Sequence, residues 1–283
     1  MEMEQVHLKS TLNLLIDKHL SQLIPEENRP QSLLYEAARY SLLLPGKRLR
    51  PIFLLKVLED YGIPVEKGLD AAAAIEMIHT YSLIHDDLPC MDDDDLRRGK
   101  PSLHKVYGEG QAVLAGDFLL TYAFEVLAKS SLPREIITII AKAAGGEGMI
   151  GGQIVDLLSE ETTPDWDTLL FMYLGKTAAL FSSALECGAV ISGASYSEQT
   201  AFRNAGKYFG IAFQIHDDIL DVTSDEETLG KPVFSDVKNK KSTCLLIFGL
   251  EKAKDISSSF LEKALNALPE KALKVQELLQ FEK

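Results

Sequence analysis

Aspartates gather at two places in this chain, each time at the end of an otherwise apolar segment. The tetrapeptide Ile-His-Asp-Asp occupies residues 84–87 and again residues 215–218, and Asp92 and Asp221 follow at short range. Grouped carboxylates on buried helices repel one another and lose hydration, so cations must compensate them. Two such clusters therefore indicate a polynuclear site for a hard, oxygen-preferring metal such as Mg²⁺.

Four groups of basic residues flank these aspartates. One is the Gly-Lys-Arg-Leu-Arg-Pro run at 46–51, at a predicted loop-to-helix junction where backbone N–H groups also favour an anion. The others are Arg97-Arg98-Gly99, Gly175-Lys176-Thr177 and Gly230-Lys231-Pro232. Taken singly, each group is readily explained as a surface cation or an ordinary ion pair. Their joint placement favours a ligand with concentrated negative charge, most simply a diphosphate.

The same ligand is expected to carry a hydrocarbon chain. The segments that lead into the two tetrapeptides, 71–84 and 205–220, are apolar nearly all round, which is typical of helices in the centre of a bundle. An apolar interior beneath the aspartates suits a hydrocarbon. A diphosphate on a hydrocarbon chain is a prenyl diphosphate.

Helices must position these residues. The eleven prolines stand at or near the edges of apolar segments, helix-favouring residues dominate between them, and no sustained alternation indicates a strand. No linker-like stretch divides the chain, so the pattern predicts an all-α protein with a single domain over 1–283. Helices are expected at 8–24, 31–44, 51–61, 69–88, 110–130, 134–159, 165–192, 198–223, 239–250 and 258–268.

Spacing on these helices groups the polar side chains into stripes. Gln214, Asp217, Asp218 and Asp221 follow i, i+3, i+4, i+7 spacing and are expected on one face. Asp92 cannot share a regular helix face with Asp86, because six residues turn about 600°. A loop after Pro89 can return Asp92 to Asp86. The alternative for residues 92–95 is a solvated acidic loop.

The composition restricts the class of protein. The chain has 283 residues, 46% of them hydrophobic, and a net charge of −13, which argues against nucleic acid or an anionic membrane as partner. The three cysteines form no CxxC pair, which favours a reducing cytoplasm. The first 18 residues hold no apolar signal segment, and no run approaches 18 uncharged apolar residues, so we expect no membrane span.

Together these residues resemble the short-chain trans-prenyl diphosphate synthases, most closely the bacterial-type farnesyl diphosphate synthases. Residues 86–92 match the DDxxxxD form of the first aspartate-rich motif, and residues 217–221 match DDxxD. The GKxxR, RRG, GKT, FQ and GK elements stand in family order between Gly46 and Lys231. The resemblance implies an all-α isoprenoid-synthase helical bundle around a central active-site cavity, and a homodimer.

The resemblance also implies roles for individual residues. Asp86, Asp92 and Asp217 would bind Mg²⁺, about three ions per active site, with Asp87, Asp218 and Asp221 assisting. Isopentenyl diphosphate would be bound by Lys47, Arg50, His79 and Arg98. The allylic diphosphate would be bound by Arg97, Lys176 and Lys231. Thr177 and Gln214 would face the reacting carbons, where their oxygen dipoles stabilise positive charge. Lys241 is similar to a further basic residue that closes the site.

The expected reaction is the condensation of isopentenyl diphosphate with dimethylallyl or geranyl diphosphate. Tyr81 lies about 7.5 Å before Asp86 along the helix, and a bulky aromatic there resembles the floor that stops growth at fifteen carbons, as farnesyl diphosphate. Its azimuth is about 140° from Asp86, so spacing alone leaves an ordinary core tyrosine open. A geranylgeranyl diphosphate synthase is the alternative.

Other classes fit the residues less well. A terpene cyclase would usually carry one DDxxD and a different second motif. His85 and His216 suggest a transition-metal site or a helical His-Asp phosphohydrolase, but they fall off the carboxylate stripes, and a phosphohydrolase leaves Arg97 and Arg98 unexplained. A non-catalytic partner subunit of a prenyl synthase would generally lack these aspartates.

Overall fold

The computed structural model describes residues 2–24, 28–159, 164–223 and 242–280. Helices make up most of this part, and its only strands are the two-residue β1 (Leu96–Arg97) and β2 (Lys100–Pro101). The all-α prediction is confirmed. Contacts divide the chain into two compact units, unit 1 (residues 1–55 and 66–132) and unit 2 (residues 56–65 and 133–283). The expectation of a single domain over 1–283 stays a prediction.

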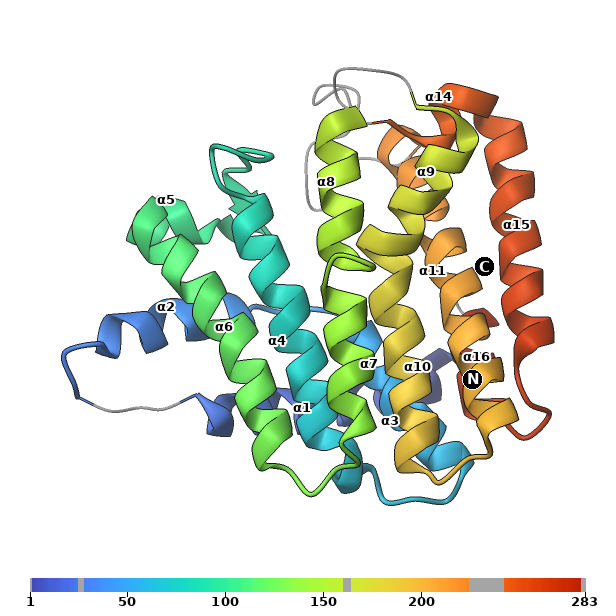
Figure 1. The fold of residues 1–283 in the computed structure, drawn as a ribbon, viewed down its shortest axis with the longest axis horizontal. Helices are drawn as coiled ribbons and strands as arrows, with labels where there is room; N and C mark the ends of the chain where they lie inside the picture. The colour runs from blue at the N-terminus through green and yellow to red at the C-terminus, as the bar shows by residue number, and fades with distance from the viewer. Residues whose placement is uncertain (1, 25–27, 160–163, 224–241, 281–283) are drawn as a thin grey trace. The chain divides into compact units, whose positions relative to one another are not determined.

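Unit 1 is organised around α4, the helix that carries the first tetrapeptide. Alanines and large apolar residues occupy most positions of α4, so the helix is buried along most of its length. It packs against α6, α1 and α2 (Figure 1). The chain leaves the helix just before Pro89, which disfavours a helical residue in front of it. The elements of unit 1 are α1 (Glu2–Leu23), α2 (Ser32–Leu42), the first part of α3 (Leu49–Asp60), most of the 3₁₀-helix η1 (Val65–Gly68), α4 (Leu69–Asp86), β1, β2, α5 (Leu103–Tyr107) and α6 (Glu109–Lys129).

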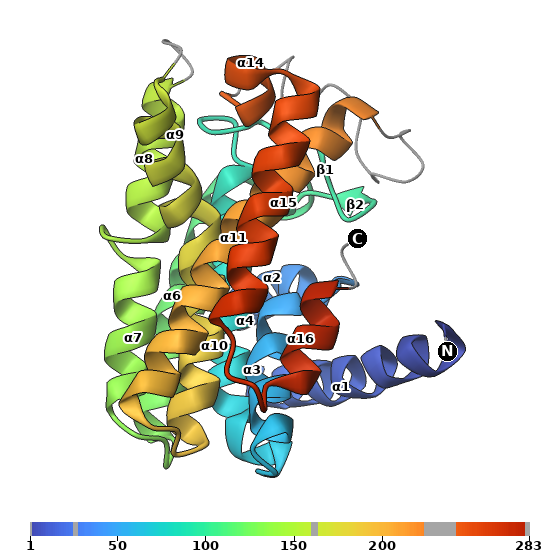
Figure 2. The ribbon, with the colours of Figure 1, turned by 90° about the vertical axis from the view of Figure 1, so that its right-hand side faces the viewer.

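Unit 2 is organised around α11, which carries the second tetrapeptide. α10 and α15 run along α11, as both views show (Figures 1 and 2). Phe181 on α10 packs edge-on against Phe209 and at a tilt against Phe213, and these two residues of α11 also contact each other. The elements of unit 2 include α7 (Glu135–Ala144), α8 (Met149–Ser159), α9 (Trp166–Tyr173), the π-helix η2 (Leu174–Ala178), α10 (Ala179–Ile191), α11 (Tyr196–Thr223), α14 (Cys244–Phe248), α15 (Leu250–Ala267) and α16 (Leu273–Gln280).

Three predicted helices differ from the structure. The helix expected at 134–159 is two helices, because Gly145, Gly146 and Gly148 form a turn closed by a bond from the Gly148 N–H to the Gly145 carbonyl. The helix expected at 239–250 is described only as α14, which ends where Gly249 adopts a φ of 77°. α15 then begins at Leu250 instead of 258, and α16 was not predicted.

Two of the described helices are long and apolar enough to cross a membrane, judged by length and composition alone. They are α6 and the continuous helix Trp166–Ile191. The protein itself buries 39% and 61% of their apolar windows. Core helices of soluble proteins have the same composition, so this is weak evidence for a span. The expectation of no membrane span stays a prediction.

Candidate active site

In unit 1, the loop after α4 brings the first motif's outer aspartates together. The Asp92 N–H donates to the Asp86 carbonyl at 2.8 Å, and Asp93 adopts a φ of 51° as the chain turns. The expected return of Asp92 to Asp86 is confirmed. Both residues are half-buried. The loop therefore places the two residues next to each other.

Asp87 faces a different environment from Asp86. It is 2% exposed, and Arg97 donates to its Oδ1 from Nε at 2.8 Å and from one Nη. Burial raises the pKa of the Asp87 carboxyl, and Arg97 opposes that rise. Arg97 also pairs with Asp94. The structure thus ties Asp87 to Arg97 inside unit 1, and its expected role at Mg²⁺ stays a prediction.

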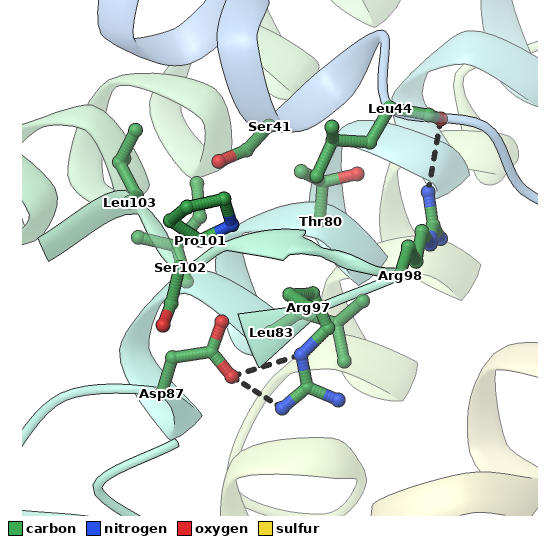
Figure 3. Close-up of a pocket in the computed structure, with 11 residues that line it drawn as sticks. Ser41, Leu44, Thr80, Leu83, Asp87, Arg97, Arg98, Pro101, Ser102 and Leu103 are labelled. Carbon is green, nitrogen blue, oxygen red and sulfur yellow. Dashed lines mark hydrogen bonds and ion pairs between the residues drawn. The ribbon is translucent and has the colours of Figure 1, made fainter. Parts of the chain in front are cut away.

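Arg97 and Arg98 point to opposite sides of a short hairpin. Arg98 and Gly99 connect β1 to β2 with φ values of 53° and 73°, the positive pair that a type I′ turn requires. Arg97, the last residue of β1, donates to Asp87, whereas Arg98, the first residue of the turn, donates to the Leu44 carbonyl at 3.3 Å (Figure 3). A cavity of about 10 Å³, room for about one water molecule, lies between them.

A buried ion pair holds the segment before α3. Arg48, 3% exposed and with a φ of 50°, donates to Glu76 at 2.6 Å, to Asp17 at 2.8 Å and to two backbone carbonyls. Arg98 lies 3.8 Å from the same Glu76. A Cβ at Gly46 would come within 2.8 Å of the Arg98 guanidinium, so only glycine leaves this approach open.

Two of the residues expected to bind isopentenyl diphosphate, Arg50 and Arg98, lie around a third, His79. Arg50 lies 3.4 Å from the His79 Nε2. Burial lowers the pKa of His79 well below its usual value, and Arg50 and Arg98 lower it further. The ring is therefore neutral at pH 7, and since arginine can only donate, its Nε2 is the acceptor. Lys47 is exposed.

In unit 2, close backbone contact positions Lys176. A Cβ at Gly152 would lie 2.1 Å from the Lys176 backbone nitrogen, and one at Gly175 would lie 2.7 Å from the Gly148 carbonyl oxygen. α8 and η2 can touch only because these residues are glycines. One turn beyond Gly152, the 3% exposed Asp156 accepts a hydrogen bond from the Lys176 ammonium.

The π-helix η2 also positions Thr177. Its hydroxyl donates to Gln214 Oε1 at 2.5 Å, so the two residues expected at the reacting carbons are neighbours. Gln214 Nε2 donates to Asp218 Oδ1 at 3.0 Å, and the Tyr173 hydroxyl donates to Asp218 Oδ2. π-Turns within α-helices frequently mark functional sites.

The aspartates of the second motif do not share one environment. Asp217 is exposed, Asp218 is 4% exposed and Asp221 is 1% exposed. The predicted single stripe is therefore divided, with Asp217 directed to the surface of unit 2 and the other two enclosed. Lys231 and Lys241 lie outside the described residues.

Tyr81 is buried beside the first motif. It is 5% exposed, and its ring packs edge-on against His85 with centroids 5.7 Å apart. Burial, assisted by Asp86, raises the pKa of Tyr81 to about 12. His85 Nε2 lies 3.0 Å from the Val113 carbonyl, and a Cβ at Gly116 would lie 2.1 Å from that nitrogen. His85 therefore links α4 to α6 by a hydrogen bond.

The acidic residues of the first motif are suited to a magnesium ion that is also bound by a substrate phosphate. Among the described residues, no three His, Cys, Asp or Glu side chains form a group that could hold a metal unaided. Mg²⁺ is usually bound through one or two carboxylates together with water and substrate phosphates. Asp86 and Asp92 supply that kind of donor.

Sequence reasoning missed four residues that organise the site. Glu76, Asp156 and Tyr173 were not selected, and Arg48 was not separated from its neighbours in the basic run. Glu76, Asp156 and Tyr173 are polar or charged side chains within apolar segments, and that was the only available signal for them. Their partners lie 20 to 45 residues away in the chain, which spacing cannot reveal.

Comparisons with known proteins agree with this arrangement. A family model described as polyprenyl synthetase matches residues 31–281. Geranylgeranyl pyrophosphate synthase 7 of Arabidopsis thaliana is 46% identical over 82% of this chain and 69% of its own length. Farnesyl diphosphate synthase of Geobacillus stearothermophilus is 42% identical over 93% of this chain and 91% of its own length.

A solved structure is similar over the same extent. The geranyltransferase of Helicobacter pylori, complexed with magnesium and isoprenyl diphosphate, has a TM-score of 0.83 and 36% sequence identity. The similarity covers 98% of this chain and 95% of that protein. This chain therefore belongs to the polyprenyl synthetase family, and it is a prenyltransferase.

Proposed function

We propose that the protein condenses isopentenyl diphosphate with dimethylallyl or geranyl diphosphate and releases farnesyl diphosphate. The observation that carries this proposal is the divergence of Arg97 and Arg98. Arg97 pairs with Asp87 and Asp94, and Arg98 approaches the Arg50–His79 group. A reaction between two diphosphates needs two anion sites, and one hairpin contributes to both.

The charges of these two groups suit different substrates. The group around Arg97 has a carboxylate excess from Asp86, Asp87, Asp92 and Asp94, so a diphosphate can bind there only with cations. The Arg50–Arg98–His79 group is cationic, because Arg48 neutralises Glu76. We assign the allylic diphosphate with Mg²⁺ to the first group and isopentenyl diphosphate, without metal, to the second.

The chain's own residues then promote ionisation and coupling. Bound Mg²⁺ would neutralise charge that develops on the departing diphosphate. Asp86, Asp87, Asp92 and Asp217 would hold it. Arg97, Lys176 and Lys231 would bind the same diphosphate.

The second basic set, Lys47 with Arg50, His79 and Arg98, would orient the double bond of isopentenyl diphosphate toward the allylic carbon. Thr177 and Gln214 oxygens would stabilise the positive charge that the carbon acquires. Proton loss would then complete a chain one isoprene unit longer.

Product length rests on Tyr81. Its ring fills the interior before Asp86 on α4, and we propose that it stops growth at fifteen carbons. The alternative is a twenty-carbon product, because the similar plant protein is named a geranylgeranyl pyrophosphate synthase.

A cytoplasmic homodimer is part of the same proposal. The three cysteines are free thiols, as in proteins of reducing compartments. Apolar side chains on α2 and α6 are exposed, among them Leu33 (47%) and Leu114 (60%), and these are suited to a second copy.

The test is incubation of the protein with Mg²⁺, isopentenyl diphosphate and dimethylallyl diphosphate. We expect release of diphosphate and a farnesyl product, resolved by chromatography after removal of the diphosphate. A geranylgeranyl product would favour the alternative. Release of inorganic phosphate or of a cyclic hydrocarbon would contradict the proposal.

A further inference from the structure

A chain of four hydrogen bonds ends at Thr177. The Cys244 N–H donates to the Tyr173 hydroxyl at 2.8 Å, and that hydroxyl donates to Asp218 Oδ2. Asp218 Oδ1 accepts from Gln214 Nε2 at 3.0 Å, and Gln214 Oε1 accepts from Thr177 at 2.5 Å. All five residues belong to unit 2, and Asp218 lies at the centre of the chain.

The chemistry of these groups fixes the direction of every bond. A backbone N–H can only donate, so the tyrosine oxygen accepts and its proton is left for Asp218. An ionised carboxylate can only accept, so Gln214 must turn its NH₂ toward Asp218. Its carbonyl oxygen then faces Thr177 and accepts the hydrogen bond that the threonine hydroxyl donates. Both lone pairs of the Thr177 hydroxyl consequently point away from Gln214.

We propose that Asp218 is a positioning residue that sets the polarity of Thr177. With its proton held by Gln214, the hydroxyl presents only its negative side to a neighbouring group, as the stabilisation of an allylic cation requires. The inference rests on the proposed function, because it concerns the cation formed there. Asp218 acts through Gln214 and Thr177 and needs no contact with the substrate.

Replacement of Asp218 by asparagine should reverse this polarity. The introduced amide must still accept the Tyr173 proton, since a buried hydroxyl with no acceptor is costly. Its NH₂ therefore faces Gln214, which must turn its carbonyl oxygen to that NH₂ and its own NH₂ to Thr177. Thr177 then accepts from Gln214, and its proton points toward the cation.

A charge swap restores the original direction. In the double variant Asp218→Asn/Gln214→Glu, the introduced glutamate accepts both from the introduced asparagine and from Thr177. Every donor keeps an acceptor, and Thr177 again presents lone pairs. Tyr173→Phe is the matched control, because it removes a bond to Asp218 but leaves the Asp218–Gln214–Thr177 direction intact.

The experiment measures kcat, the KM for the allylic diphosphate and Tm for these variants. Asp218→Asn should lower kcat on the order of 10²-fold, with little change in KM. The swap should recover kcat to within about tenfold of wild type. Tyr173→Phe should lower Tm yet reduce kcat less than about tenfold. A merely structural role of the cluster would instead make kcat follow Tm in all three.

Two outcomes would contradict the proposed role of Asp218. Wild-type kcat in Asp218→Asn, or a folded swap variant as slow as the single variant, would overturn the proposal. If neither variant that carries Asp218→Asn folds, Tyr173→Phe tests the proposal by itself. A 10²-fold loss of kcat in Tyr173→Phe would then overturn the proposal. Failure of the wild-type protein to form any prenyl product would instead refute the proposed function.

Discussion

Among single residues, Tyr81 carries a buried polar group that packing in an apolar core does not favour. Its hydroxyl is buried and finds no hydrogen-bond partner within the described part of the chain. An unpaired buried hydroxyl costs about 1–3 kcal/mol, so phenylalanine would serve stability better. The ring, which phenylalanine would also supply, is therefore the part of Tyr81 to which we assign the proposed role in limiting product length.

Substitution of Tyr81 by alanine tests this role. The change opens space beneath Asp86, and we expect the main product to lengthen from fifteen to twenty carbons, as resolved by chromatography. Tyr196→Ala is the control, because Tyr196 is 77% exposed and its loss should leave product length unchanged. An unaltered product from Tyr81→Ala would remove this residue from the pocket floor.

The residues of the site were only partly predictable from the sequence. Motif spacing predicted that Asp92 returns to Asp86, because that return depends on local geometry, whereas the joint role of Thr177 and Gln214 was implied only by the resemblance to the synthases. It did not predict that Asp87 and Asp218 are enclosed by Arg97 and Tyr173. Helical periodicity gives the direction of a side chain but not the residue that meets it.

At the scale of elements, the contact between α8 and η2 depends on Gly152. Its replacement by alanine places a Cβ 2.1 Å from the Lys176 backbone nitrogen and must displace one helix. We expect a loss of about 1–3 kcal/mol in the free energy of unfolding, with a fall in kcat because Lys176 and Thr177 move.

Gly110→Ala is the matched control in α6, where a Cβ meets nothing within 4 Å. Its free energy of unfolding should stay within about 1 kcal/mol of wild type. Denaturant titration of both variants measures the difference, and equal stabilities would show that the helices do not require glycine at 152.

The junction of α16 with the start of α11 is sensitive to acid. Lys271 pairs with Glu198 at 2.6 Å, and hydrogen bonds from Lys271 and Ser195 lower the pKa of Glu198 from 4.5 to about 2. A depressed carboxyl pKa stabilises the fold above pH 4.5, and that contribution disappears as the pH falls to about 2.

Glu198→Gln should therefore lower Tm at pH 7 by roughly 1–2 °C and leave Tm at pH 2 unchanged, because an exposed pair is weak. Scanning calorimetry at both pH values measures this. An equal decrease at pH 2 would mean that packing, not charge, is lost.

The local sequence pattern predicts some helix boundaries and not others. The continuous helix Trp166–Ile191 and the break at Gly193 match the prediction, because apolar runs and a glycine with a φ of 68° are local signals. The π-turn in η2 has no such local signal, and its Gly175 packs against Gly152 of α8. α16 was not predicted because the helix has only eight residues and is only partly apolar.

At the scale of the whole molecule, the proposed dimer can be disrupted on α6. Leu114→Glu places a charge at a residue that is 60% exposed, and we expect the protein to elute as a monomer in chromatography with light scattering. Leu246→Glu is matched for exposure at 61% on α14 and should leave the mass unchanged. A dimeric Leu114→Glu protein would exclude this surface as the interface.

We propose that the two aspartate motifs, residues 86–92 and 217–221, act on one Mg²⁺-bound allylic diphosphate. The most direct measurement is the initial rate of prenyl product formation against Mg²⁺ concentration for wild type, Asp86→Asn and Asp217→Asn. We expect each variant to lose at least about 10²-fold in kcat and to need more Mg²⁺ for half-maximal rate. A wild-type rate that survives removal of Mg²⁺, or either variant with wild-type activity, would contradict the account.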